Sequence, residues 1–296
     1  MTLHAYAFDC VTHHLFHPHG TNSLQNDKDA DIMREVTLDD SLQNRLTKHY
    51  YPTLHAIFGR LLSLFAKPRS TPLADNFVLE ATSQTDTAAF TLLHRLQQAR
   101  ESDRGGTLDA LDVAAECLDH MVAGIDTTGD ALCFLMWELS QPSSIHFQRR
   151  LQAELRRLLA NSSTEEPGGP TAASCLDVRK FPYLDAVVNE GLRCFPAIPM
   201  SLPRRVPSGG RTIDGFLVPG GTTVSCQACS VQRLDGEVFP DPDVFRPDRW
   251  LEEKGEAERR RLSFAFASGG RGCIGKQYVA LFLSLLPTIR VTGAAC

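Results

Sequence analysis

The chain has 296 residues, of which 43% are hydrophobic and 22% are charged, and its formal net charge is −5. This composition is typical of a soluble globular protein, and the acidic balance argues against a broad nucleic-acid-binding surface. No run of eighteen apolar residues occurs, so we predict no transmembrane anchor within the chain. Nine cysteines without regular spacing and an N-terminus without a secretory signal favour a reducing, cytoplasmic location.

Apolar periodicity predicts a fold that is mainly α with a small β-sheet portion. Residues 31–48 are polar and weakly periodic, whereas residues 161–170 are rich in Pro and Gly and predict an exposed loop. We interpret 1–296 as one domain: a helical part over 1–160, the loop over 161–170, and helix, small sheet and coil over 171–296. The helices are expected at 50–65, 87–100, 107–139, 144–160 and 185–194.

The β portion is expected after residue 200. Asp214-Gly215 lies between apolar residues, which is typical of a two-residue hairpin turn, and 222–225 predicts a further strand. Prolines 240, 242 and 247 argue against regular elements in 235–250, which we predict to be a coiled meander.

The most informative stretch is residues 266–275, with the sequence FASGGRGCIG, followed by an apolar segment at 276–286 that predicts a helix. A thiolate at a helix N-terminus is stabilised by the dipole and by free N–H groups. Glycines allow the backbone to approach the sulfur of Cys273, and the Arg271 guanidinium suits a carboxylate. The alternative is a buried cysteine that acts as a small hydrophobic residue in a turn.

This stretch resembles the haem loop of cytochrome P450 monooxygenases, FxxGxRxCxG, at every fixed position. The resemblance implies that Cys273 is the axial thiolate ligand of haem iron and that Arg271 pairs with a haem propionate. It further implies that Phe266 packs near the haem edge and that Gly269 and Gly275 give backbone access to the sulfur.

A second segment, AGIDTTG at 123–129, resembles the (A/G)Gx(D/E)T(T/S) motif of the same family. Glycine within a helix costs about 1 kcal/mol relative to alanine, so it often marks a place where another group approaches the backbone. The resemblance makes Asp126 and Thr127 an acid–alcohol pair that delivers protons. The alternative is a tolerated glycine within an ordinary helix.

Two further segments follow in the order that the family has. Glu190 and Arg193 match ExxR, and the segment FRPDRW at 245–250 resembles FxPxRW and supplies Arg249. The resemblance assigns these three residues to a structural network rather than to chemistry.

Arg204 aligns best with the basic residue that contacts a haem propionate in this family, with Arg205 as the alternative. The run Arg259–Arg261 is interpreted as a solvated helix end that could add to a reductase-docking surface.

The resemblance, strongest to filamentous-fungal enzymes, implies a haem-thiolate monooxygenase with haem b. It would insert one oxygen atom of O2 into a hydrophobic small molecule, with electrons from NADPH through a reductase partner. A role in fungal secondary metabolism is our hypothesis. The alternative is a catalytically silent remnant, or an interaction module, that does not hold haem stably.

The match to the family is expected to be incomplete. Residues 6–24 resemble the helix that follows the N-terminal region of the family, so a helix is expected there. No WxxxR segment is found, and 23 residues (296 − 273) follow Cys273, where the family continues through a hairpin. We expect a P450 fold that is incomplete at the N-terminus and at this hairpin, through a truncated gene model, a fragment of a larger enzyme or a decayed gene. A full-length relative is expected at the endoplasmic reticulum membrane.

Overall fold

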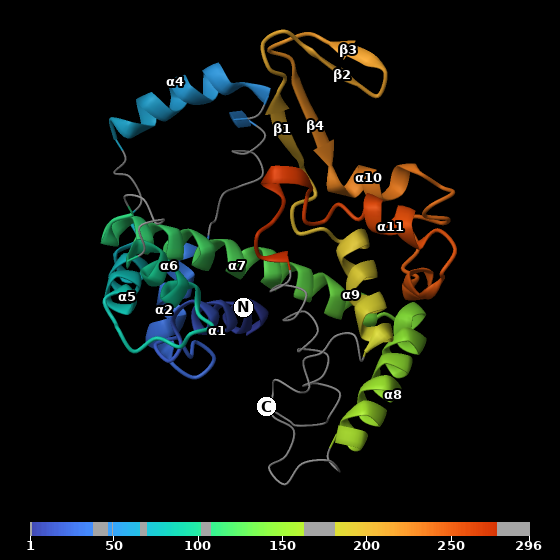
Figure 1. Cartoon of the computed structure of the whole chain (residues 1–296), viewed down its shortest axis with the longest axis horizontal. Coiled ribbons are helices and arrows are strands. Elements are labelled where there is room, and N and C mark those ends of the chain that lie inside the picture. Colours follow the sequence, from blue (N-terminus) through green and yellow to red (C-terminus); the bar gives the residue numbers. More distant parts are fainter. Residues whose placement is uncertain are drawn as a thin grey trace. The chain divides into compact units, whose positions relative to one another are not determined.

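The computed structural model describes residues 2–37, 47–48, 50–65, 70–101, 108–162 and 181–276. Over these ranges the chain is mainly helical with small two-stranded sheets (Figure 1), which confirms the predicted fold class. The chain divides into two compact units, 1–126 and 127–296. The boundary falls within the longest described helix, α7 (Ala110–Leu139).

The first unit contains short helices, most of which pack through apolar faces. They are α1 (Thr2–Phe16), α2 (Asp27–Val36), α4 (Pro52–Ser63), α5 (Pro72–Thr82), α6 (Leu92–Glu101) and the first half of α7. Helix α1 supplies much of the core, because Phe8, Leu15 and Phe16 are at most 1% exposed. The ring of Phe16 meets the ring of Phe77 of α5 edge-on, with centroids 5.6 Å apart.

The Asp9 carboxylate on α1 holds the segment that follows this helix. It accepts hydrogen bonds from the backbone N–H of Ser23 at 2.6 Å and of Leu24 at 3.2 Å, and from the Thr21 hydroxyl at 2.9 Å. These bonds satisfy backbone donors in an irregular loop, which would otherwise need water. Asn26 then begins α2 as its N-cap, because its side chain accepts from the Lys28 N–H.

Helix α7 runs without interruption through the glycine–threonine segment 123–129. A Cβ at Gly124 would lie 2.8 Å from Cγ2 of Val11 on α1, a distance that carbon atoms do not tolerate. The group that approaches the backbone here is therefore a side chain of α1. The glycine permits close packing of two helices within the first unit.

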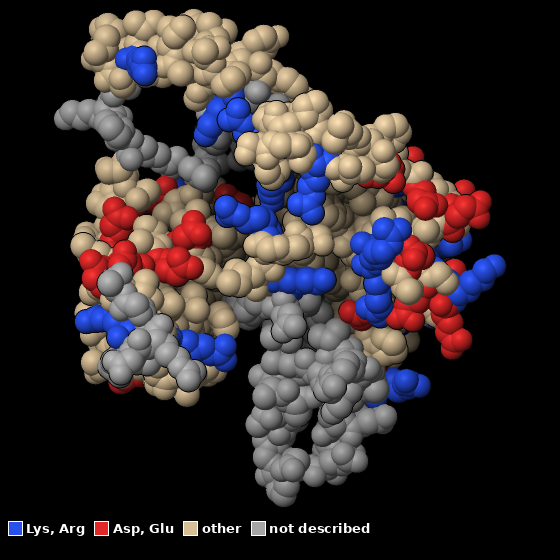
Figure 2. All heavy atoms as spheres, turned by 45° about the horizontal axis from the view of Figure 1, so that its top comes forward, with Lys and Arg blue, Asp and Glu red and all other residues tan. Residues whose placement is uncertain are grey.

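Helix α4 presents apolar side chains to solvent, and none of its residues is buried. Tan atoms dominate this helix in Figure 2, because Arg60 is its one Lys or Arg and it has no acidic residue. No described helix is both long and apolar enough to span a membrane. The exposed large apolar residues of α4 and its flanks are Tyr50, Tyr51, Leu54, Ile57, Phe58, Leu61, Leu62, Leu64 and Phe65.

The second unit holds the remaining elements. They are η1 (Pro142–Ser144), α8 (Ile145–Ser162), α9 (Pro182–Cys194), β1 (Ser201–Arg205), β2 (Arg211–Ile213), β3 (Phe216–Val218), β4 (Thr223–Gln227), α10 (Ala228–Leu234), η4 (Pro247–Leu251), α11 (Glu256–Leu262) and η5 (Gly269–Arg271). Helix α9 is central, since it contacts α8, α10 and η4 and most of its residues are buried. Its first turn is fixed by the Glu154 carboxylate of α8, which accepts from the N–H groups of Tyr183 and Leu184 at 3.0 and 2.9 Å.

The strands form two antiparallel pairs. Strand β1 pairs with β4, with Ser201 opposite Gln227 and Arg205 opposite Thr223. Strands β2 and β3 form the hairpin that Asp214-Gly215 predicts. Both turn residues have positive φ, 48° and 80°, as a type I′ turn requires. The predicted hairpin is confirmed, and the predicted strand at 222–225 corresponds to β4.

Some boundaries differ from the sequence predictions. The helix expected at 6–24 is α1, which begins at Thr2 and ends at Phe16, before Pro18 and Gly20. The expectation of no regular element in 235–250 is wrong at its end, because η4 begins at Pro247; proline suits the first position of a helix, where its missing N–H is not needed. Helix α6 begins after Thr91, whose hydroxyl accepts from the His94 N–H, rather than at residue 87. Residues 161–162 belong to α8, while 163–170 and the predicted helix beyond Lys276 lie outside the described residues.

Candidate functional site

The second unit contains a buried carboxylate surrounded by donors, which we call the Glu190 network (Glu190, Arg193, Arg249 and Trp250). Arg193 binds both carboxylate oxygens, through Nε at 2.8 Å and Nη2 at 2.9 Å. Arg249 donates from Nε at 3.0 Å, and the Trp250 indole donates at 2.9 Å. The Arg246 backbone N–H adds a bond at 2.8 Å, so the carboxylate, fully buried at 0% exposure, accepts five hydrogen bonds.

The remaining guanidinium donors fix the coiled segment before η4. Arg193 Nη1 donates to the Pro242 carbonyl at 2.6 Å, and Arg249 Nη1 donates to the Pro240 carbonyl at 2.8 Å. Both arginines also donate to the Val244 carbonyl, each at 3.2 Å. Pro240 and Pro242 have no N–H, and this part of the segment forms no helix or strand, so the charged donors satisfy carbonyls that a regular element would pair.

The Glu190 carboxylate stays ionised despite its burial. Burial alone would raise its pKa, but the hydrogen bonds from Arg193 and the charges of Arg193 and Arg249 outweigh this effect and hold the pKa below its usual value. Because both arginines are themselves buried, removal of the carboxylate would leave their charges without a counter-ion. The network therefore behaves as a structural unit.

Gln232 of α10 connects the Glu190 network to the cysteine loop (264–275). Its amide nitrogen donates to the Arg193 carbonyl at 3.0 Å, and its oxygen accepts from the Phe264 N–H at 2.8 Å. The side chain is completely buried, and its hydrogen bonds all go to backbone groups. One amide thus links the C-terminal end of α9 to the start of the loop that contains Cys273.

The cysteine loop is closed by its own backbone hydrogen bonds. The Cys273 N–H donates to the Phe266 carbonyl at 2.8 Å, and the Ala267 N–H donates to the Phe264 carbonyl at 3.0 Å. Gly269 has a φ of 72°, in the left-handed region that glycine adopts without strain. The thiol-bearing residue Cys273 is exposed, in contrast to the alternative reading of a buried hydrophobic cysteine.

The other predicted residues of this loop lie on both sides of Cys273 in the sequence. A Cβ built on Gly275 would lie 3.8 Å from Sγ of Cys273, so a longer side chain there would extend beside the sulfur. Arg271 is exposed and hydrogen-bonds to no other described side chain. Phe266 is half-buried, and the Lys276 ammonium lies 6.0 Å from its ring centroid.

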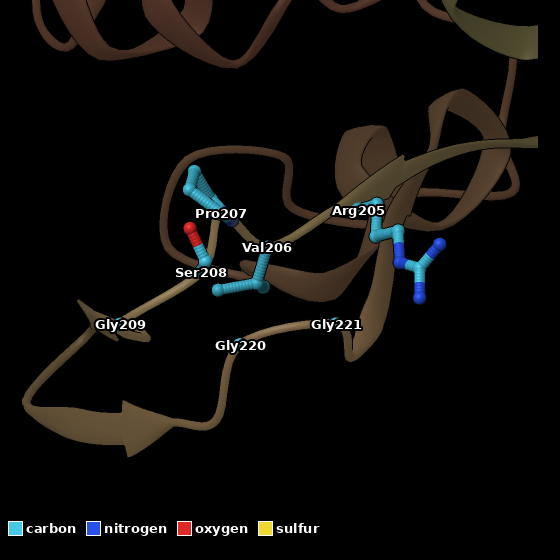
Figure 3. Close-up of a pocket in the computed structure, with 7 residues that line it drawn as sticks. All are labelled: Arg205, Val206, Pro207, Ser208, Gly209, Gly220 and Gly221. Carbon is cyan, nitrogen blue, oxygen red and sulfur yellow. The ribbon is translucent and has the colours of Figure 1, made fainter.

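Arg204 and Arg205 occupy adjacent positions of β1, so their side chains leave opposite faces of the strand. Arg204 is exposed, and its Nη1 donates to the Pro203 carbonyl at 2.9 Å. Arg205 lies at one end of a hollow between two turns (Figure 3), and its guanidinium lies 3.7 Å from a Cβ built on Gly221. The hollow is lined by Arg205, Val206, Pro207, Ser208, Gly209, Gly220 and Gly221.

Asp126 and Thr127 lie at consecutive positions of α7, at the boundary between the two units, and both are half-buried.

Among the predicted site residues, the structure brings together Glu190, Arg193 and Arg249, and separately Phe266 and Cys273. Sequence reasoning missed Gln232 and the Trp250 indole as members of this site. Trp250 stands in the matched FRPDRW segment, but no sequence signal indicated Gln232.

Comparison with known proteins identifies the class to which this fold and site belong. The family model described as Cytochrome P450 matches residues 5–286. Cytochrome P450 monooxygenase ACRTS1 of Alternaria alternata is 34% identical over 211 residues, which cover 70% of this chain and 54% of the relative. Cytochrome P450 monooxygenase stcB of Emericella nidulans is 30% identical over 243 residues, which cover 78% and 43%. Lithocholate 6-beta-hydroxylase of Mesocricetus auratus is 27% identical over 296 residues, which cover 96% and 56%.

The chain belongs to the cytochrome P450 family, as its motifs predict. It spans about half the length of these three curated relatives. The donor set of the second unit fits the haem-thiolate group that the family implies. It offers an exposed thiol, an exposed guanidinium two residues earlier and one glycine, Gly275, beside the sulfur; an iron ion binds a thiolate, and a propionate pairs with a guanidinium.

Proposed function

We propose that the protein of which this chain is part is a haem-thiolate monooxygenase acting on a hydrophobic small molecule. The observation that carries the proposal is the exposed Cys273 thiol on a loop that is closed by Phe266 and anchored by Gln232. A structural cysteine of a core would be buried, whereas a thiolate ligand needs an open side. Membership of the family supports the same assignment.

Each site residue has a role in this proposal that follows from its chemistry. Cys273 would be the thiolate ligand of haem b, and Gly275 would leave the space beside its sulfur free. Arg271, with Arg204 from β1, would pair with the propionates, because guanidinium groups bind carboxylates in a fixed fork. Phe266 would pack at the edge of the ring, and Gly269 would provide the turn that the loop needs.

The bound group would supply the activation of dioxygen, from which one oxygen atom enters the substrate. The chain would hold the substrate, exclude water and deliver protons. Asp126 and Thr127 are the proposed acid–alcohol pair, since a carboxyl and a hydroxyl at adjacent positions can pass a proton between them. Electrons would come from NADPH through a reductase partner. A role in fungal secondary metabolite biosynthesis is part of this proposal.

We also propose that the protein acts at a membrane surface such as the endoplasmic reticulum. Residues 41–74 contain five basic residues (Arg45, Lys48, Arg60, Lys67 and Arg69) and no acidic residue, although the whole chain is acidic. Helix α4, with its exposed Tyr, Leu, Ile and Phe side chains, lies within this stretch. An apolar helix in a basic segment suits the headgroup region of an anionic bilayer.

The experiment that tests the haem proposal is expression of the chain with a haem precursor, followed by the carbon monoxide difference spectrum of the reduced protein. We expect a red-shifted Soret band typical of thiolate ligation, and its loss in Cys273→Ser. Cys226→Ser is the matched control, because Cys226 is also exposed but lies on β4. A folded wild-type chain that takes up no haem would instead support a haem-free remnant.

A further inference from the structure

The arginine run at the end of α11 leads directly into a serine that the proposed chemistry does not use. Arg260 and Arg261 stand three and two residues before Ser263, and Phe264 follows it. Both guanidinium groups are at the surface, with 63% and 65% of the side chain exposed. The Ser263 hydroxyl makes no hydrogen bond to any described residue.

The segment around Ser263 is weakly held. Within α11 (Figure 1), Arg259 is the one buried residue, and its guanidinium donates to the carbonyls of Lys254 and Glu252. A helix of seven residues has little stability of its own, so α11 depends on these few contacts. Local opening of α11 through Ser263 therefore exposes one buried side chain, Arg259, and the half-buried Leu262.

Arg260 and Arg261 can also form ion pairs with acidic side chains of another protein. Arg260 pairs with Glu256 and Arg261 pairs with Glu258, each at 2.7 Å, and all four side chains are about half exposed or more. Surface pairs of this kind are screened by water and contribute little. Carboxylates on a protein surface that binds this segment can replace Glu256 and Glu258 at small cost.

We propose that Ser263 is a phosphorylation site for an arginine-directed serine/threonine protein kinase. Such kinases read charge patterns through acidic pockets, and arginines three and two residues before the acceptor, with an apolar residue after it, fit that pattern. In the reaction the Ser263 oxygen attacks the γ-phosphorus of Mg·ATP, and the bond to the β-phosphate oxygen breaks. ADP leaves, and the hydroxyl proton passes to the aspartate base of the kinase.

The phosphate would act on the cysteine loop through its position in the chain. It would place about two negative charges at the C-terminal end of α11, where the helix dipole disfavours anions. It would also compete with Glu256 and Glu258 for Arg260 and Arg261. Ser263 immediately precedes Phe264, whose N–H is bound by Gln232, so a loosened α11 weakens this anchor of the loop.

The test uses the full chain, the catalytic subunit of cAMP-dependent protein kinase and Mg·ATP. Mass spectrometry should find one phosphoryl group, located on Ser263, with none in Ser263→Ala and retention in Ser263→Thr. Arg260→Ala and Arg261→Ala should each lower the initial rate roughly tenfold, equivalent to about 1.4 kcal/mol. Arg156→Ala, an exposed arginine of α8, should leave the rate unchanged.

Absence of incorporation into a chain with native circular dichroism would overturn the proposal, and so would phosphate on another residue such as Ser208 or Ser268. The structural consequence has its own readout in amide hydrogen exchange. Exchange over 256–264 should be faster in the phosphorylated chain than in the unmodified one. Unchanged or slower exchange there would show that the modification does not loosen α11.

Discussion

Glu190→Gln should strongly destabilise the second unit, because it removes the charge that neutralises two buried arginines. The amide keeps the shape of the side chain but accepts at one oxygen, whereas the carboxylate accepts three hydrogen bonds at Oε1 and two at Oε2. Two buried donors thus lose their acceptor, at about 1–3 kcal/mol each. Breaking a buried pair by removing one partner costs about 3–5 kcal/mol, which agrees with this sum.

The measurement is urea unfolding followed by far-ultraviolet circular dichroism, with the free energy of unfolding obtained by linear extrapolation. Glu258→Gln is the matched control, because Glu258 also pairs with an arginine three residues later, at 2.7 Å, but its side chain is 52% exposed. We expect this control to change the stability by less than about 1 kcal/mol. A Glu190→Gln variant as stable as the control would refute the account of the Glu190 network.

Three further predictions follow from the same contacts. Because the pKa of Glu190 is held below its usual 4.5, the ionised carboxylate stabilises the fold above that pH, and this contribution is lost as the pH falls through the lowered pKa. The difference in unfolding free energy between the wild type and Glu190→Gln should therefore narrow below about pH 4.5 and stay constant above it. A difference that grows in acid would show that the pKa of Glu190 is raised rather than lowered. Gly124→Ala should lower the free energy of unfolding by about 1–3 kcal/mol, because its Cβ would lie 2.8 Å from Val11. In the double variant, Val11→Ala should restore most of that free energy. If the losses of the two single variants simply add, the contact with Val11 is not the cause. Gln232→Leu should speed hydrogen exchange of the Phe264 backbone N–H at least severalfold, as measured by mass spectrometry. Unchanged exchange would show that the Gln232 side chain does not anchor the cysteine loop.

Local chemistry allowed much of the fold to be predicted. The Asp-Gly pair specified the β2–β3 hairpin because only a positive-φ turn matches the strand twist, and both residues adopt it. Apolar periodicity predicted α7 and α9 to within three residues at their ends. The start of α6 was missed because the Thr91 hydroxyl, rather than the apolar pattern, sets it.

The site was predictable where a motif holds its residues together and unpredictable where contacts join distant segments. Glu190 and Arg193 are one helical turn apart, so their pairing follows from spacing. The bond from Arg249 spans 59 positions and was expected through the family resemblance alone. Gln232 binds only backbone groups brought together by the fold, and glutamine on a short helix carries no signal of such contacts.

The central proposal is that the Cys273 sulfur is the axial ligand of a haem iron. X-ray absorption at the iron edge of the haem-loaded chain tests it most directly, because sulfur and nitrogen scatterers are distinguished around the metal. We predict one sulfur ligand in the wild type and in Cys226→Ser, and none in Cys273→Ser. A shell of nitrogen and oxygen alone in the wild type, or sulfur retained in Cys273→Ser, would contradict the account.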